Sequence, residues 1–353
     1  MDDDGTRDAK RPGATYRDAG VDIDAQDEGL RRIKAALSST RTAGVLADLG
    51  AFGGMFAPDL GGLAQPVLVA SCDGVGTKLK VAFAAGIHDT VGRDLVNHCV
   101  NDILVQGATP LFFLDYLATA RLAPEVMAAV VDGIADGCRE NGCALLGGET
   151  AEMPGFYAPG EYDLAGFIVG LVDRSKILDG SAVRDGDVLV GLPSAGLHTN
   201  GYSLARRIFF DIAGLNVRDT PDGLPVPIGE ALLAEHRSYL KVLRGALAQG
   251  LVRALAHVTG GGLTDNVPRI LPPALDAKIV RGSWTVPPVF RVLERLGGVD
   301  ASEMHRVFNM GIGMVCVIAP DRLAAFEEHL AAVREPSARI GTIVPGRGRV
   351  VYA

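Results

Sequence analysis

The chain has 353 residues, enough for two domains of average size. Hydrophobic residues make up 48% and charged residues 22%, and the mean hydropathy is +0.22, which excludes a disordered chain. No apolar run approaches the ~18 residues of a membrane helix, so we expect no membrane partner. The 34 basic and 42 acidic residues give a net charge of −8 without a basic cluster, which argues against a nucleic-acid partner.

The N-terminus and the cysteines favour a cytoplasmic location. Residues 2–4 are acidic, where a secretory signal would carry bases and then an apolar core. The five cysteines are odd in number and form no C-x-x-C pair, which is typical of a reducing compartment. Because residues 1–14 mix charges and lack large apolar side chains after Met1, we expect them to be a disordered leader.

Strands and helices are predicted to alternate along the N-terminal half. A first helix is expected to be capped by Asp24, because Leu30, Ile33 and Leu37 follow it at helical spacing. Strands are predicted over 67–72, 111–114, 143–146 and 167–172, with helices over 91–106 and 124–140.

A polar stretch, residues 173–187, separates this half from a second series of elements. We place the boundary near residue 179, which gives domains over 15–178 and 179–353. In the second half, strands are predicted over 188–192, 254–258, 314–318, 340–344 and 349–352, with helices over 202–210, 263–270 and 322–333. The fold class of both domains is therefore α/β (or α+β).

The first strand leads into the segment Asp73-Gly74-Val75-Gly76-Thr77-Lys78. It combines a carboxylate for a hard cation, glycines that let a ligand approach the backbone, a hydroxyl group and an amine, which are parts of a nucleotide-phosphate site. The glycine spacing fits neither a Walker A loop nor a dinucleotide fingerprint. A tight turn with a solvated lysine is an equally good interpretation.

Two further segments with acidic residues can be interpreted either as functional or as purely structural. Asp102 lies on the helix that we expect Gly107 to end, and it is a second candidate ligand for magnesium. Alternatively, Asp94, His98 and Asp102 form a solvated helix face with ordinary i, i+4 pairing. The segment 147–155 is either a functional glycine-framed loop with two carboxylates or a surface turn.

Histidines and glycines stand out in the second half. His198 lies in a glycine-framed loop before a helix that Asn200 could cap, and an imidazole there can transfer protons or bind phosphate. Its glycine frame favours the substrate cleft over the core. His257 lies in an apolar strand, where a core histidine is the stronger interpretation. The run Gly260-Gly261-Gly262 is either an anion cradle at a helix N-terminus or a flexible turn.

Taken together and in this order, these segments resemble the phosphoribosylformylglycinamidine cyclo-ligase family, also called the aminoimidazole ribonucleotide synthetases. The segments that carry the resemblance are 16–22, 73–78, 101–116, 147–155, 196–204, 259–263 and 308–314. The resemblance implies an ATP-dependent ring closure on a phosphoribosyl formamidine in purine synthesis. It also implies a homodimer in which the sheets of the N-terminal, ATP-binding domains form one barrel.

The same resemblance assigns residues to roles. ATP would be bound by Asp73, Gly74, Gly76, Thr77, Lys78, Asp102, Gly107 and Glu149, with Mg²⁺ on Asp73 and Asp102. The catalytic residues would be His198, His257 and Lys34. The substrate phosphate would be bound by Thr199, Asn200, Gly260, Gly261 and Gly262. Two positions depart from the family pattern: Ala195 and Thr199 stand where serine is common, and only Thr199 keeps the hydroxyl group.

Other interpretations remain open at this point. The nucleotide segments alone are also similar to thiamine-monophosphate kinase, selenophosphate synthetase and a hydrogenase-maturation protein. Selenophosphate synthetase relies on a cysteine or selenocysteine in an N-terminal glycine-rich segment, whereas the first cysteine here is Cys72, at the end of a predicted strand. The hydrogenase-maturation protein relies on a C-terminal cysteine, whereas this chain ends in Tyr352-Ala353. A non-catalytic ATP-binding regulator is expected to lose some of the acidic, lysine and histidine residues above, and this chain keeps them.

Overall fold

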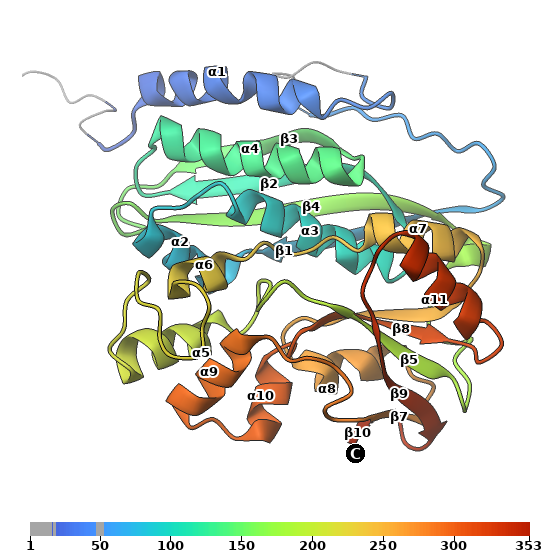
Figure 1. The fold of residues 1–353 in the computed structure, drawn as a ribbon. Coiled ribbons are helices and arrows are strands. Elements are labelled where there is room, and N and C mark those ends of the chain that lie inside the picture. Colours follow the sequence, from blue (N-terminus) through green and yellow to red (C-terminus); the bar gives the residue numbers. More distant parts are fainter. Residues whose placement is uncertain (1–15, 17–18, 47–52) are drawn as a thin grey trace, which may run out of the picture.

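The computed structural model describes residue 16 and residues 19–46 and 53–353, and the predicted leader over 1–14 lies outside them. Two sheets, each with its own helices, make up the molecule (Figure 1). The first sheet has the order β1-β4-β2-β3. Its strands are β1 (Pro66–Gly74), β2 (Thr109–Thr119), β3 (Ala144–Glu152) and β4 (Tyr162–Asp173). Both neighbours of β4 are antiparallel to it and β2 is parallel to β3, so the sheet is mixed.

Helices cover one face of this sheet. They are α3 (Val91–Leu104) and α4 (Pro124–Asn141), and α1 (Ile23–Ser39) lies over α4 as an outer layer (Figure 1). The short helix α2 (Leu79–Ala85) precedes α3 in the chain. Asp22, not the predicted Asp24, caps α1, because Asp22 has extended backbone angles and its carboxylate accepts from Ala25 N at 3.3 Å. Asp24 lies in the first turn instead, where its charge suits the helix dipole.

The strands of the first sheet are longer than predicted, because they continue through glycines and charged residues. Gly147, Gly148 and Glu149 were predicted to start a loop, but they lie in β3 and pair with β2. A side chain on Gly148 would come within 2.6 Å of Asp115 O, so this glycine serves close strand pairing. Glu149 is exposed on this strand, and the prediction of a glycine-framed loop around it is wrong.

The second sheet has the order β10-β7-β9-β5-β8-β6, with only β10 and β7 parallel. Its strands are β5 (Val188–Pro193), β6 (Val252–His257), β7 (Leu275–Ile279), β8 (Ile312–Ile318), β9 (Ala338–Pro345) and β10 (Val350–Tyr352). Its helices are α5 (Tyr202–Arg206), α6 (Ile228–Leu233), α7 (Leu240–Ala248), α8 (Gly262–Asn266), α9 (Pro288–Gly297), α10 (Ala301–Val307) and α11 (Leu323–Ala332). The predicted helix over 202–210 is α5 followed by a π-helical turn, Arg207–Ile212, and the one over 263–270 is α8 followed by a 3₁₀ turn.

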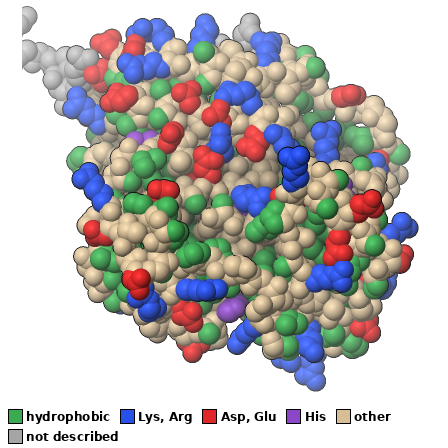
Figure 2. Space-filling model, in the orientation of Figure 1, with side chains coloured by type: hydrophobic (Ala, Val, Ile, Leu, Met, Phe, Trp, Pro, Cys, Tyr) green, Lys and Arg blue, Asp and Glu red, His purple; other side chains and the backbone are tan. Residues whose placement is uncertain are grey.

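The helix α3 joins the two halves. It packs on α4 and the first sheet with one side and on α7 of the second half with the other. As a result its polar residues Asp94, Asn97, His98 and Asn101 are buried, and the predicted solvated face is wrong for Asp94 and His98. None of the described helices is long and apolar enough to cross a membrane. On the face drawn in Figure 2, basic and acidic side chains of the described residues are interspersed.

Candidate active site

A cavity of about 460 Å³ lies between the two halves. The N-terminal half contributes β1 and α3, the C-terminal half contributes β6 and the segment after it, and residues 177–179 of the connection line the same space. The polar residues that line it are Ser71, Asp102, Gln106, Asp179, His257, Thr259, Asn266 and Arg269. Clefts between domains are common places for small-molecule sites.

Asp102 and His257 meet at this cavity from opposite halves. The Nδ1 of His257 lies 2.8 Å from one Asp102 oxygen, and Ser71 Oγ donates to the other at 3.0 Å. Burial alone would raise the pKa of Asp102, but the hydrogen bond and charge of His257, the charge of His98 and the hydrogen bond from Ser71 together lower the pKa. Asp102 is therefore a carboxylate at neutral pH.

Asp73, at the end of β1, forms a second pair with a histidine of α3. His98 Nε2 lies 2.7 Å from one Asp73 oxygen, and Gly74 N donates to the other at 2.7 Å. Here too burial would raise the pKa, and the hydrogen bond and charge of His98 lower it. The same His98 nitrogen lies 3.9 Å from Asp102, which brings the two carboxylates near one another.

These two carboxylates suit a hard divalent cation. Both are ionised and partly exposed, and each of their oxygens keeps a lone pair beyond the hydrogen bonds described. Oxygen donors of this kind are the ligands that Mg²⁺ prefers. The donor set therefore fits the magnesium ion that the sequence predicted on Asp73 and Asp102.

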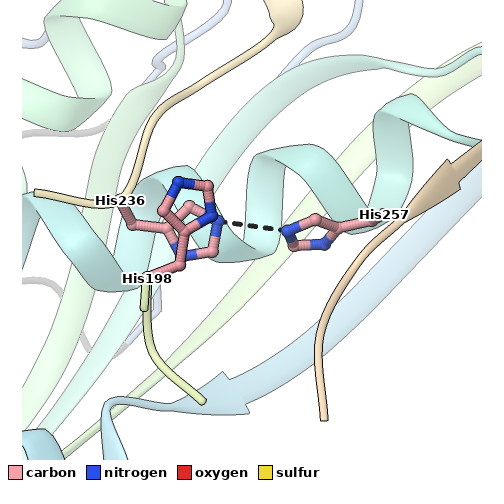
Figure 3. Close-up of side chains that lie close together, drawn as sticks. All are labelled: His198, His236 and His257. Atoms are coloured by element: carbon pink, nitrogen blue, oxygen red, sulfur yellow. Dashed lines mark hydrogen bonds between the residues drawn. The ribbon is translucent and has the colours of Figure 1, made fainter. Parts of the chain in front are cut away.

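Behind the cavity, a buried group of histidines connects the two pairs, and Figure 3 shows three of these histidines, His198, His236 and His257. His236 Nε2 lies 3.1 Å from His257 Nε2, and its Nδ1 lies 3.3 Å from Thr199 Oγ1. That hydroxyl also lies 2.5 Å from His98 Nδ1. Contacts within hydrogen-bond distance therefore run from Asp73 through these residues to Asp102.

His198 stacks on His236 with ring centroids 4.0 Å apart and an interplanar angle of 23° (Figure 3). The ring nitrogens of His198, His236 and His257 all lie within 4.8 Å of one another. However, the lone pairs of an imidazole lie in the ring plane, so two stacked rings do not direct them at one ion. Burial, followed by electrostatic interaction with the neighbouring histidines and Lys78, lowers the pKa of His198 and His236 well below the usual range. Both rings are neutral and form a packed core of the site.

Comparison with known proteins gives two matching family models. AIR synthase related protein, N-terminal domain, matches residues 61–172, and the C-terminal domain model matches residues 184–353. A phosphoribosylformylglycinamidine cyclo-ligase of Gloeobacter violaceus is 54% identical over 334 residues, 94% of this chain and 98% of that protein. One of Nitratidesulfovibrio vulgaris is 52% identical over 334 residues, 95% of each chain. The chain belongs to the phosphoribosylformylglycinamidine cyclo-ligase family. It is therefore an enzyme, a C–N bond-forming ligase, as the sequence predicted.

Solved structures of proteins with other names share the fold of this cyclo-ligase family member. The hydrogenase maturation protein HypE of E. coli matches with a TM-score of 0.66 at 18% identity, over 94% of both chains. Thiamine-monophosphate kinase from Stenotrophomonas maltophilia matches with a TM-score of 0.62 at 19% identity, over 92% of this chain and 95% of that one. At such low identity the likeness concerns the fold alone.

Two lysines that were predicted to belong to the site do not line the cavity. Lys78 is fully buried, where its Nζ lies 2.6 Å from Asp94 and donates to Ala234 O at 2.9 Å. The interpretation of Lys78 as a solvated lysine is therefore wrong. Its amine is already paired within the protein and is not free to bind a phosphate. Lys34 is exposed on α1, the outer helix that packs on α4, and it does not lie with the histidines.

The predicted phosphate-binding segments do come together. A side chain on Gly260 would come within 3.2 Å of Asn200 Oδ1, and Asn200 Nδ2 is a buried donor without a partner among the described atoms. Asn200 does not cap α5, since Gly201 occupies the cap position without a side-chain bond. Gly107 ends α3 with a φ of 83°, and its neighbour is Lys176 O of the connection. Gly76 and Thr77 are exposed next to Asp73.

The histidines were only partly predicted. His198 is fully buried, so its expected place in an open substrate cleft is wrong. Its backbone has a φ of 61°, and of the two glycines that frame the loop only Gly201 has a positive φ. His257, which we interpreted as a core residue, lines the cavity. His236 was not predicted at all. It has no glycine loop or apolar strand beside it, and nothing in its local sequence indicates that it is buried.

Proposed function

We propose that this chain converts phosphoribosylformylglycinamidine into aminoimidazole ribonucleotide, with ATP as the second substrate and ADP and phosphate as products, in de novo purine biosynthesis in the cytoplasm. The observation that carries this proposal is the cavity in which Asp102 of one half meets His257 of the other. The names and high identity of the relatives support the choice of reaction.

The chemistry explains why ATP is needed. Ring closure requires the formyl oxygen of the substrate to leave, and hydroxide is too poor a leaving group at neutral pH. Transfer of the γ-phosphoryl group to that oxygen gives an imidoyl phosphate. The amidine nitrogen then attacks the activated carbon, the C–O bond breaks and phosphate leaves. The cavity between the halves holds the reacting groups together and excludes water, which would hydrolyse the activated intermediate.

Residues of both halves would bind the substrates and the metal ion. Asp73 and Asp102 would hold Mg²⁺, which offsets the charge on the phosphates when it is bound. Asn200 Nδ2 and the backbone of Gly260, Gly261 and Gly262 would bind the substrate phosphate, supported by the unpartnered amide at that position. Thr199 would contribute less, because its hydroxyl already contacts His98 and His236. His257, oriented by Asp102, would face the reacting formamidine.

We further propose a homodimer built through the first sheet, with domains over 15–178 and 179–353. The face of this sheet opposite α3 and α4 carries exposed apolar side chains on β1, β2 and β4: Leu68, Tyr116 and Phe167. Antiparallel sheets normally leave such a face polar when it meets water. Joining this face to that of a second copy would complete a barrel and cover the apolar surface.

An oxygen-label experiment tests the reaction. Substrate that carries ¹⁸O in the formyl carbonyl is incubated with the enzyme and Mg-ATP, and the released phosphate is analysed by ³¹P NMR. We expect one labelled oxygen in each phosphate and one ADP per imidazole formed. Unlabelled phosphate, or a stable phosphorylated product, contradicts the activated-amide reaction. Phosphorylation of thiamine monophosphate in a parallel assay would favour the kinase alternative.

A further inference from the structure

The segment 234–239 connects α6 with α7 and has no helix or strand of its own. It belongs to the C-terminal half, yet several of its backbone groups form hydrogen bonds with side chains of the N-terminal half. Buried backbone groups outside regular structure still need partners. The side chains that supply these partners determine where the segment lies.

Four buried side chains of the N-terminal half bind backbone groups of this segment, and we call Lys78, Asp94, Asn97 and Asn101 the interdomain latch. His236 N donates to Asp94 Oδ1 at 2.6 Å, and Asn97 Nδ2 donates to His236 O at 2.8 Å. Asn101 uses both ends of its amide: Nδ2 donates to Arg237 O at 2.8 Å and Oδ1 accepts from Tyr239 N at 3.0 Å. Lys78 donates to Ala234 O at 2.9 Å.

The latch places its charges where water does not reach. Lys78 and Asp94 are fully buried and form an ion pair of 2.6 Å. A buried pair of this kind contributes little net stability over an apolar pair, but it fixes geometry because either charge alone is costly. The pair therefore holds Asp94 in the one position from which it accepts from His236 N.

His236 is the residue that the latch fixes most tightly, because both its backbone N and its backbone O are bound. From there its ring reaches His257, with 3.1 Å between the two Nε2 atoms (Figure 3). His257 in turn contacts Asp102 through Nδ1 and lines the cavity, whereas His236 does not line it. The contacts from the latch to His236, from His236 to His257 and from His257 to Asp102 all lie within hydrogen-bond distance.

We propose that His236 is a positioning residue of the ligase site, fixed by the interdomain latch and holding the imidazole of His257 at the cavity. This inference rests on the proposed function, because it takes the reaction to occur in that cavity. His236 acts through His257, so it should affect the chemical step more than the binding of either substrate.

The test compares two substitutions of one side chain. His236→Leu keeps much of the volume and removes the ring nitrogens, whereas His236→Gln keeps a polar atom near the position of Nε2. We expect His236→Leu to lower kcat by about tenfold or more with KM for ATP within about twofold, and His236→Gln to recover most of the loss. Nitrogen-15 NMR of the His257 ring should shift in the leucine variant and return toward wild type in the glutamine variant.

Asp187→Asn is the matched control. Asp187 is a buried carboxylate that pairs with Arg253 at 2.7 Å, in the C-terminal half and outside the histidine group. An equal loss of kcat in this control would show that lost stability alone is responsible and would overturn the proposal. Unchanged kcat or an unchanged His257 ring signal in His236→Leu would overturn it as well. A wild-type enzyme that forms no imidazole would refute the proposed function, and the His257 signals would still decide the positioning.

Discussion

At the scale of single residues, Asp102 serves both halves of the site. One oxygen faces His257 and the other accepts from Ser71, and the carboxylate lines the cavity. The sequence indicated its chemistry, since it follows Asp73 in an order typical of a metal and nucleotide site. It did not indicate the histidine that contacts each carboxylate, because these contacts join residues 25 and 155 positions apart.

Asp102→Asn should therefore lower turnover by about a thousandfold or more, because the amide lacks the negative charge that would hold Mg²⁺ and orient His257. The melting temperature should change little, since the amide oxygen can still accept from His257 Nδ1 while the amide nitrogen donates to the Ser71 hydroxyl group. Steady-state kinetics and a thermal melt check both expectations. Ser71→Ala, which removes only the hydroxyl donor to Asp102, is the control and should retain most of the activity. Wild-type turnover in Asp102→Asn would remove this residue from the site.

His198→Ala should reduce stability, contrary to what the glycine-framed loop alone suggests. The ring is fully buried and stacks on His236, so its removal leaves a cavity that costs about 2–4 kcal/mol. His198→Gly separates the loss of the ring from the strain of the backbone, because glycine adopts the φ of 61° without strain. We expect chemical denaturation to show both variants destabilised, with alanine the worse. Wild-type stability in both would contradict a core role.

At the scale of elements, the sequence predicted where most helices and strands lie but not where they end. Apolar periodicity identified α3, α4 and the centres of β1 to β4, since these segments face a core. Strand ends were missed where glycines serve close pairing, as in β3, because the same glycines also suit a loop. The short strand β7 and the helices α2, α6, α7, α9 and α10 were not predicted. Burial of α3 on two sides follows from the packing of distant segments, which local pattern does not contain.

The contact between α3 and α4 gives a test at this scale. Gly133 of α4 lies so close to the start of α3 that an added side-chain carbon would come within 2.5 Å of Asp89 O. Gly133→Ala gains up to about 1 kcal/mol of helix propensity, but the clash with backbone should outweigh it and give a net loss of about 1–3 kcal/mol. Asp132→Ala, on the exposed side of the same helix, should change the free energy of unfolding by less than about 0.5 kcal/mol. Equal stability of the two variants would refute the close approach.

At the scale of the whole molecule, the first sheet is covered on one face only. The α3 and α4 helices pack on that face, and the other face carries Leu68 with 65% of its surface exposed and Phe167 with 39%. Phe167 lies opposite Cys72 of β1 and Leu114 of β2, so apolar groups of three neighbouring strands share this face. A patch of this kind is a typical interface between copies of a chain.

Phe167→Glu should therefore convert a dimer into monomers, because a carboxylate in the centre of an apolar interface loses its hydration without gaining a partner. Sedimentation equilibrium checks this, with wild type expected near twice the chain mass of 36.9 kDa and the variant near that mass. Ile212→Glu is the control, since Ile212 is 55% exposed but lies in the C-terminal half. The control should remain a dimer. A Phe167→Glu protein that sediments like wild type would contradict assembly through this sheet, and a monomeric wild type would show that the exposed face has no second copy to cover it.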